Sequence, residues 1–158
     1  GGPLMHIIAA KAVAFKEAMD PSFKDYAKKI VENSKKLCQL LKDEGFKIVS
    51  GGTDNHMFLI DLRPLDMTGS QLSQALASTG LVVNKNVIPF DKLSPSLTSG
   101  IRIGTPSVTS RGMGEKEMIK IGEYITYVIK NIDNLTKLKD ISKKVLALAN
   151  DFPVYEKA

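Results

Sequence analysis

The amino-acid sequence predicts an α+β fold, in which helices pack on a small antiparallel sheet. Two observations carry this prediction: helix-like apolar spacing occupies both ends of the chain, and short strand-like runs are grouped between them. In addition, no linker rich in proline, glycine or serine and no repeat divides the 158 residues. This length can bury one core, so we expect one main folding unit.

The first half of the chain predicts two helices and then two strands. Pro3 stands at a favoured first-turn position, and an apolar-rich run over residues 4–18 follows it. A second helix is expected from Asp20-Pro21 to a glycine stop at Gly45. Its predicted apolar face comprises Phe23, Tyr26, Ala27, Ile30, Val31, Leu37 and Leu41. The two strands flank a turn-prone segment, are expected to pair antiparallel, and cover residues 46–49 and 57–62.

The second half predicts a short helix, two strands and two long helices. Thr68 and Gln71 form a capping-box pattern for a helix that runs to about residue 78, with Gly80 as its stop. Strands bracket a long polar loop, and apolar residues at helical spacing then predict two amphipathic helices. These four elements are strands near 81–83 and 100–103, a helix beginning after Gly114 and a helix from about 135 to 149.

The most informative residue is Arg102, which stands alone between two isoleucines and two glycines in the run GIRIG, residues 100–104. In a short strand, alternation sends Ile101 and Ile103 to one face and Arg102 to the other, and the glycines leave room for a ligand. A guanidinium donates two parallel hydrogen bonds to a carboxylate and stays protonated. The pattern indicates a carboxylate-binding arginine, and an ion pair with a surface acid is the alternative reading.

The positive charge of the chain is carried almost wholly by lysine. The chain has 22 basic and 17 acidic residues, a formal net charge of +5, and its arginines are Arg63, Arg102 and Arg111. The lysines alternate with acids along the predicted helices, whereas nucleic-acid-binding proteins usually cluster arginine with aromatic residues. We therefore expect solubility and a mild attraction for polyanions, with no required nucleic-acid partner. Arg111 is expected to fix a loop or meet an acid, and Arg63 to be a charge at a strand end.

Other chemistry-bearing residues are read as structural. Cys38 is the single cysteine and falls within a helical pattern, which predicts a reducing, cytoplasmic setting and no catalytic thiol. His6 and His56 have no cysteine or carboxylate ligands at useful spacing, so no metal site is expected. No apolar run approaches membrane length and no signal peptide is visible. Because Gly1 is not an initiator methionine and a helix is predicted almost at once, we expect a piece of a longer protein.

Four runs carry a resemblance to a known enzyme family. They are GGPLMHIIAAKAVAFKEAM at residues 1–19, VSGGTDNHMFLIDL at 49–62, VVNKN at 82–86 and SGIRIGTP at 99–106. The run FPVY, residues 152–155, also resembles the end of bacterial members. The likeness is nearly gapless along the chain. The sequence is similar to serine hydroxymethyltransferase, of which it covers only a part.

The resemblance implies a fold-type-I enzyme dependent on pyridoxal 5'-phosphate, which interconverts serine and glycine and passes the one-carbon unit to tetrahydrofolate. Residues 1–20 resemble the last helix of the large domain, and residues 21–158 resemble the small C-terminal domain. The family's Thr-Thr-His-Lys-Thr-like run with the Schiff-base lysine is not in this sequence, nor are its cofactor-stacking histidine, its ring-pairing aspartate and its acid-base glutamate. We therefore expect the cofactor to be bound mainly by the large domain, and this chain alone to contain no catalytic residue and to be inactive.

Three groups of site residues follow from the resemblance. Arg102 matches the arginine that binds the carboxylate of the amino acid. Gly1 and Gly2 match glycines that approach the cofactor phosphate of the neighbouring subunit, where a helix N-terminus favours an anion. This arrangement implies a homodimer, or a tetramer built from such dimers. The matched folate-binding positions are Asn86, Ser94, Pro95 and Ser96.

The folate segment combines a good match with one departure from the family. Asn86 can both donate to and accept from the edge of a pterin, although from the residues alone it reads as part of a turn. Ser96 stands where the family usually has phenylalanine, so aromatic packing on the ligand is in doubt, and Leu97 is a partial substitute. Lys85 and Lys92 either attract the glutamate tail of folate or are simply solvated.

Two other classes remain open at this point. The first is a lysine-rich binding module for RNA or another polyanion, which a steep loss of binding with added salt would favour. The second is a non-catalytic domain that assembles with partners. Finding the lysine run of the large domain upstream of this chain would exclude the second class.

Overall fold

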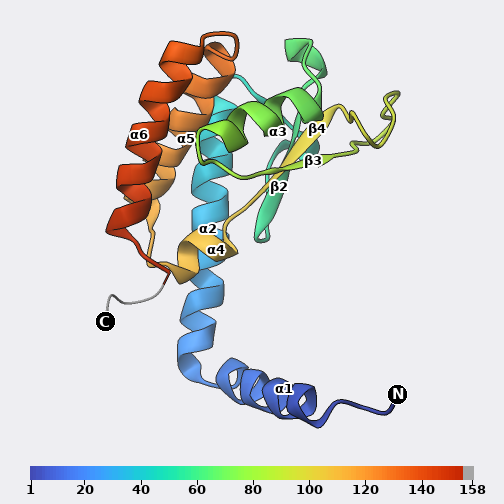
Figure 1. Cartoon of the computed structure of the whole chain (residues 1–158), viewed down its shortest axis with the longest axis vertical. Helices are drawn as coiled ribbons and strands as arrows, with labels where there is room; N and C mark the ends of the chain where they lie inside the picture. The colour runs from blue at the N-terminus through green and yellow to red at the C-terminus, as the bar shows by residue number, and fades with distance from the viewer. Residues whose placement is uncertain (155–158) are drawn as a thin grey trace.

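The computed structural model describes residues 1–154, so Tyr155 of the FPVY run lies outside the described residues. It contains an α+β arrangement of helices on one antiparallel sheet, as the sequence predicts (Figure 1). In chain order its elements are α1 (Met5–Ala18), α2 (Pro21–Asp43), β1 (Lys47–Ile48), η1 (Val49–Gly51), β2 (Met57–Asp61), η2 (Arg63–Leu65), α3 (Gly69–Ser78), β3 (Asn84–Asn86), β4 (Gly100–Gly104), α4 (Pro106–Ser110), α5 (Glu115–Lys130) and α6 (Leu135–Asp151).

The sheet has four strands in the order β1-β2-β4-β3, and every neighbouring pair is antiparallel. The central strands β2 and β4 pair over their whole length, from Met57 opposite Gly104 to Asp61 opposite Gly100. This topology places β3 and β4 side by side, with a long loop between them. The sequence therefore brings the two segments that carry the predicted ligand-binding residues onto adjacent strands.

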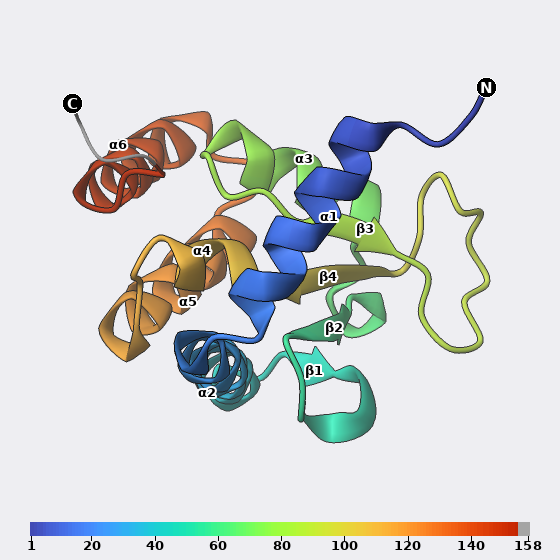
Figure 2. The same cartoon turned by 90° about the horizontal axis from the view of Figure 1, so that it is seen from below.

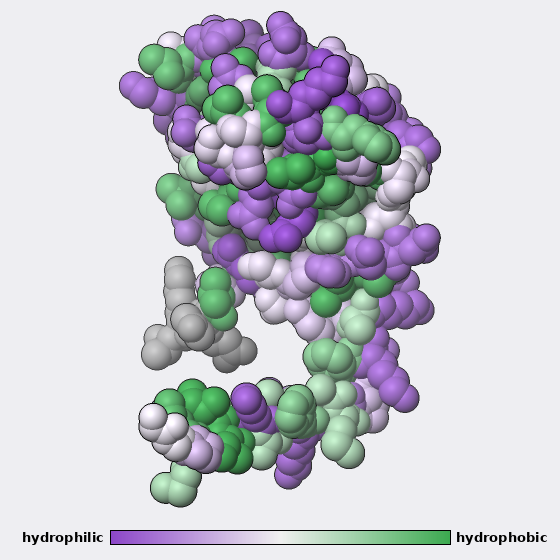
Figure 3. All heavy atoms as spheres, turned by 90° about the vertical axis from the view of Figure 1, so that its right-hand side faces the viewer, coloured by the Kyte–Doolittle hydropathy of each residue, from purple (hydrophilic) through white to green (hydrophobic). Residues whose placement is uncertain are grey.

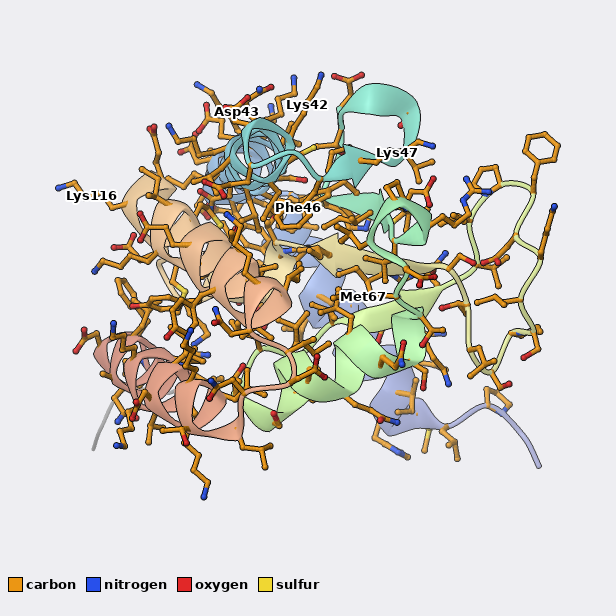
Figure 4. All side chains as sticks on the ribbon, turned by 90° about the horizontal axis from the view of Figure 1, so that it is seen from above. Lys42, Asp43, Phe46, Lys47, Met67 and Lys116 are labelled. Carbon is orange, nitrogen blue, oxygen red and sulfur yellow. The ribbon has the colours of Figure 1, made fainter. Side chains whose placement is uncertain are left out.

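One face of the sheet is covered by helices, and this is where the core lies. Figure 2 shows α2, α5 and α6 on one side of the strands. Side chains from β2 and β4 pack there against apolar residues of α2, α3, α5 and α6, and the fully buried members include Ile60, Ile101, Leu41, Leu72, Met118 and Val128. In Figure 4, Phe46 points inward at the junction of α2 and the sheet, whereas Lys42, Asp43 and Lys116 point outward.

Helix boundaries follow the predicted caps. Asp20 accepts a hydrogen bond from the Ser22 amide at 2.8 Å, and Pro21 occupies the first turn of α2. Thr68 and Gln71 form the predicted capping box of α3. The glycine predicted to end each of these helices, Gly45 or Gly80, has φ near +90°, which glycine adopts without strain.

Two local predictions were wrong. Residues 81–83 show the alternating burial expected of a strand, with Leu81 and Val83 against the core and Val82 exposed, but they have no strand partner. Instead β4 pairs with residues 84–86, the segment predicted as a turn, since pairing and not side-chain alternation defines a strand. The short helix α4 was not predicted, although Pro106 at its start is a favourable signal.

Helix α1 stands apart from the rest of the molecule. None of its residues is buried: Met5 and Phe15 are 82% and 68% exposed, and Met19, directly after its end, is 83% exposed. Figure 3 shows hydrophobic side chains gathered on α1 with a gap between it and the main body. The chain changes direction at Asp20, so residues 1–20 and the folded body meet only through the start of α2. No helix within residues 1–154 combines the length and the apolar character needed to cross a membrane.

Candidate functional site

Strand β4 presents Arg102 on the face of the sheet that the helices leave open. Ile101 is fully buried and Ile103 is 6% exposed in the core, whereas Arg102 between them is exposed. The alternation predicted from the sequence is therefore confirmed. The direction of Arg102 follows from the requirement that both isoleucines face the core.

Arg102 makes no ion pair with an acid among residues 1–154. Its direct cross-strand neighbours are Asn84 on β3 and Leu59 on β2, both uncharged. The alternative reading, a surface ion pair, is not what the structure has. Within residues 1–154 none of the five N–H donors of this side chain has a partner, so they can bind an anionic ligand.

Asn86 lies on the same open face as Arg102. It pairs with Gly100, two residues along β4 from Arg102, and cross-strand geometry places such diagonal Cβ atoms on the order of 7–8 Å apart. Its side-chain nitrogen Nδ2 donates to the Val87 backbone carbonyl at 2.7 Å, which leaves the side-chain oxygen Oδ1 free. The close approach of β3 to β4 depends on Gly100, because a Cβ there would lie 2.4 Å from Ile88 Cγ2 and 3.0 Å from the Asn86 carbonyl oxygen.

The loop of residues 87–99 carries Ser94, Pro95 and Ser96, all of them exposed. The hydroxyls of Ser94 and Ser96 are 2.7 Å apart, and the Ser94 carbonyl accepts hydrogen bonds from the amides of Leu97 and Thr98. Lys85 donates from Nζ to the Ser96 carbonyl at 2.6 Å, so this lysine is engaged by the loop itself. Leu97 is 45% exposed and stays available for contact with a ligand.

The structure does not bring Gly1 and Gly2 to the Arg102 face. Both are exposed, precede α1, and have no atom within 4 Å of the position that a Cβ would occupy. The first turn of α1 contains no acidic residue and its N-cap, Leu4, provides no side-chain hydrogen bond. Backbone N–H groups at this end are thus open to an anion.

The remaining arginines have structural partners. Arg111 donates to the carbonyls of Ala149 and Phe152, each at 2.6 Å, and so caps the end of α6. Arg63 makes a two-pronged contact with the buried Asp61, which Lys47 also approaches at 3.0 Å. The Arg63 guanidinium holds the pKa of Asp61 well below its usual range. These contacts agree with the structural roles expected from the sequence.

Neither the cysteine nor the histidines form a reactive or metal-binding group within residues 1–154. Cys38 is buried in α2, and burial raises the pKa of its thiol, which disfavours the reactive thiolate. Histidine, cysteine and acidic side chains do not gather anywhere in this part of the chain in a way that could hold a metal ion.

Arg102 lines neither of two hollows on the surface of residues 1–154. One of about 580 Å³ is lined by residues 49–55 and 57–59, and so reaches Leu59, the β2 neighbour of Arg102. A larger one, of about 760 Å³, lies between α2 and the start of α5. Arg102 and Asn86 therefore occupy an open sheet surface, and a second body must cover it to enclose a small ligand.

Sequence reasoning missed Asp91 in the loop. This carboxylate accepts four hydrogen bonds, one from each amide of Ile88, Leu93 and Ser99 and one from the Ser99 hydroxyl. The Ser99 hydroxyl is the main cause that lowers the pKa of Asp91 to about 2. An aspartate two residues after a proline in a polar loop is a signal of local capping, but its bond to a residue eight positions away is not visible in sequence.

Comparison with known proteins assigns the chain to a family. The family model described as Serine hydroxymethyltransferase matches residues 1–125. A relative from Endomicrobium trichonymphae, named "Serine hydroxymethyltransferase", is 54% identical over 155 residues, which cover 98% of this chain and 37% of the relative. The chain thus spans little more than a third of that relative's length. With a match over most of its residues, the chain belongs to the serine hydroxymethyltransferase family.

Proposed function

We propose that this chain is the C-terminal part of an enzyme that interconverts serine and glycine and passes the one-carbon unit to tetrahydrofolate. Residues 1–20 would be the last helix of a large domain, and residues 21–158 the small domain. The observation that carries the proposal is Arg102, a guanidinium without a partner among residues 1–154, on an open sheet face shared with Asn86. Membership of the family supports the same reaction.

Arg102 would bind the carboxylate of serine or glycine. Two parallel hydrogen bonds to one carboxylate would fix the direction of the amino acid. The uncharged neighbours of Arg102, Asn84 and Leu59, cannot provide such a pair of charge-assisted hydrogen bonds. Pyridoxal 5'-phosphate, when bound, supplies the electron sink for breaking a bond at the amino acid's α-carbon. The large domain would hold most of this cofactor, and the isolated chain would be inactive.

Gly1 and Gly2 would contribute to the phosphate site of a partner subunit. Their open N–H groups and the exposed apolar surface of α1 support this role, because both features require a second body to cover them. The enzyme would thus be a homodimer, or a tetramer built from dimers. Its expected location is the cytoplasm.

Asn86, Ser94, Pro95 and Ser96 would form the folate side of the cleft. Asn86 keeps a free acceptor oxygen, and the exposed tip of residues 94–96 offers hydroxyls and the apolar ring of Pro95. The polyanion alternative gains no support, since six of the described lysines pair with acids, as in Lys36 with Glu115 and Lys130 with Glu44.

The test uses the full-length enzyme, meaning this chain preceded by the N-terminal part that its relative has. Arg102→Lys keeps the charge but loses the planar fork, and should cost about 2–4 kcal/mol in transition-state stabilisation for serine. Asn86→Ala should weaken tetrahydrofolate-dependent cleavage by about 1–3 kcal/mol and leave folate-independent cleavage of allo-threonine nearly unchanged. Unchanged kcat/KM for serine in Arg102→Lys would remove Arg102 from the carboxylate site. Equal loss of both reactions in Asn86→Ala would remove Asn86 from the folate site.

A further inference from the structure

The loop of residues 87–99 is closed at its base by a single side chain. Asp91 Oδ2 accepts hydrogen bonds from the amide of Ile88 at 3.3 Å and from the amide of Ser99 at 2.8 Å. Asp91 Oδ1 accepts from the Ser99 hydroxyl at 2.6 Å and from the Leu93 amide at 3.0 Å. Ile88 is two residues beyond Asn86 and Ser99 immediately precedes β4, so one carboxylate ties together the two ends of the loop.

All the acceptor capacity of Asp91 is directed into the loop. A carboxylate offers about four lone-pair positions, and all four of the contacts above use them for donors of the loop backbone or of Ser99. The low pKa of Asp91 keeps it ionised at neutral pH, where charge-assisted hydrogen bonds are strongest. Asp91 is therefore not free to contact a ligand, and its contribution is to the shape of the loop.

The segment around Asp91 is held in a conformation that needs such support. Asp91 donates its own amide to the Ile88 carbonyl at 3.0 Å, closing a turn in which Phe90 has φ 59°. Left-handed backbone is unfavourable for a bulky residue, and Phe90 has no packing to compensate, since it is 94% exposed. The bonds of Asp91 are thus what holds this turn in place.

The other leg of the loop is docked on α3. The amides of Gly69 and Ser70 donate to the carbonyls of Thr98 and Leu97, each at 2.9 Å. Between this docked leg and Asp91 lies the exposed tip of residues 94–96, whose hydrogen bonds are those from Lys85, between its own two serines, and from the amides of Leu97 and Thr98 in the docked leg. The position of the tip relative to Asn86 is therefore set by its two legs, of which one depends on Asp91.

We propose that Asp91 is a positioning residue for the folate side of the site. It fixes the position of residues 94–96 relative to Asn86 without touching the ligand, so that its loss raises the KM for tetrahydrofolate and spares the amino-acid site at Arg102. The inference rests on the proposed folate role of Asn86 and the loop tip. It adds the side chain that determines whether the tip is in place before the ligand arrives.

The variant that tests this inference is Asp91→Asn in the full-length enzyme. It keeps the shape of the side chain but replaces one acceptor oxygen with an NH2 group that faces N–H or O–H donors. We expect a rise of about tenfold in the KM for tetrahydrofolate, with folate-independent cleavage of allo-threonine within about twofold of the unmodified enzyme. Ser99→Ala, which removes one of the four bonds, should give a smaller rise of the same kind. Asp133→Asn, at an exposed aspartate outside this loop, is the matched control and should change neither reaction.

A structural measurement separates positioning from general damage. In Asp91→Asn, hydrogen exchange should accelerate at the amides of Ile88, Leu93 and Ser99, while β2 keeps its protection. An unchanged KM for tetrahydrofolate in Asp91→Asn, with a raised KM in Asn86→Ala, would overturn the role of Asp91 and leave the folate site standing. A parallel loss of both reactions with exchange accelerated throughout β2 would also overturn it. Absence of tetrahydrofolate-dependent cleavage in the unmodified full-length enzyme would instead overturn the proposed function.

Discussion

Gly69 is the tightest contact between α3 and the loop that leads into β4, and Gly69→Ala tests it. A Cβ at this position would lie 2.1 Å from Thr98 Oγ1, 2.3 Å from the Gly100 carbonyl oxygen and 3.2 Å from Lys85 Cβ. The Gly100 oxygen belongs to a paired strand, and Thr98 is buried with φ 56°. Thr98 Oγ1 can rotate, with loss of its hydrogen bond to the Gly100 carbonyl, but that carbonyl cannot move without a backbone shift, so a rotamer change does not relieve the clash.

The magnitude follows from two opposing effects. Alanine is favoured over glycine within a helix by up to about 1 kcal/mol, and less at the first helical position. Overpacking of this kind typically costs about 1–3 kcal/mol, and the upper part of that range applies where backbone must shift. The clash therefore prevails, and we expect a net loss of about 1–2 kcal/mol. For a chain of this size that corresponds to a fall in Tm of about 2–8 °C.

The assay is urea and thermal unfolding of the 158-residue chain, followed by circular dichroism. Gly52→Ala is the control, because Gly52 has extended backbone, φ 173°, and no atom within 4 Å of an added Cβ. Its stability should stay within about 0.5 kcal/mol of the unmodified chain. If Gly69→Ala is as stable as Gly52→Ala, α3 does not pack against residues 98–100 as closely as described, and the account of how the loop is docked fails.

Two further outcomes are expected. The Arg63 guanidinium, and then the Lys47 ammonium, lower the pKa of Asp61 against the opposing effect of burial. The stability that Asp61 contributes is therefore complete above its ordinary pKa of 3.8 and is lost as the pH falls below that value. Urea midpoints should therefore drop near pH 3. Asp61→Asn should be about 1–3 kcal/mol less stable than the unmodified chain at neutral pH, and its stability should fall less steeply in acid. Parallel curves of stability against pH for the two chains would contradict this. The isolated chain, mixed with pyridoxal 5'-phosphate and desalted, should retain no absorbance that responds to serine, because the proposed cofactor lysine lies in the large domain. Reduction and peptide mapping exclude adducts of surface lysines, and a stable serine-responsive band would show that the chain holds the cofactor by itself.

Local patterns were sufficient where a residue's role depends on its immediate neighbours. The direction of Arg102 follows from Ile101 and Ile103 on either side, and the start of α3 follows from Thr68 and Gln71. Each of these signals lies within four residues of sequence. Their physical causes, burial of alternate side chains and capping of free amides, act over the same short range.

Features that depend on distant residues were not predictable in this way. The strand at residues 84–86 exists because β4 lies beside it, and the wrong prediction at 81–83 came from side-chain alternation without knowledge of that partner. Gly69 read as an ordinary helix start, although its contact with Thr98 and Gly100 lies about thirty positions further along. The bonds between Asp91 and Ser99 likewise need the folded loop.

Helix α2 connects α1 to the sheet. It runs for 23 residues, a length of about 34 Å, and its later half is packed into the core through Leu37 and Leu41. The only break between it and α1 is the corner at Asp20 and Pro21. If α1 is clamped by another body, a rotation of about 10° at this corner would move the far end of α2 by about 6 Å. Such a rotation would also move β4. The distance between Arg102 and the body that covers its face of the sheet would then depend on a hinge far from the site.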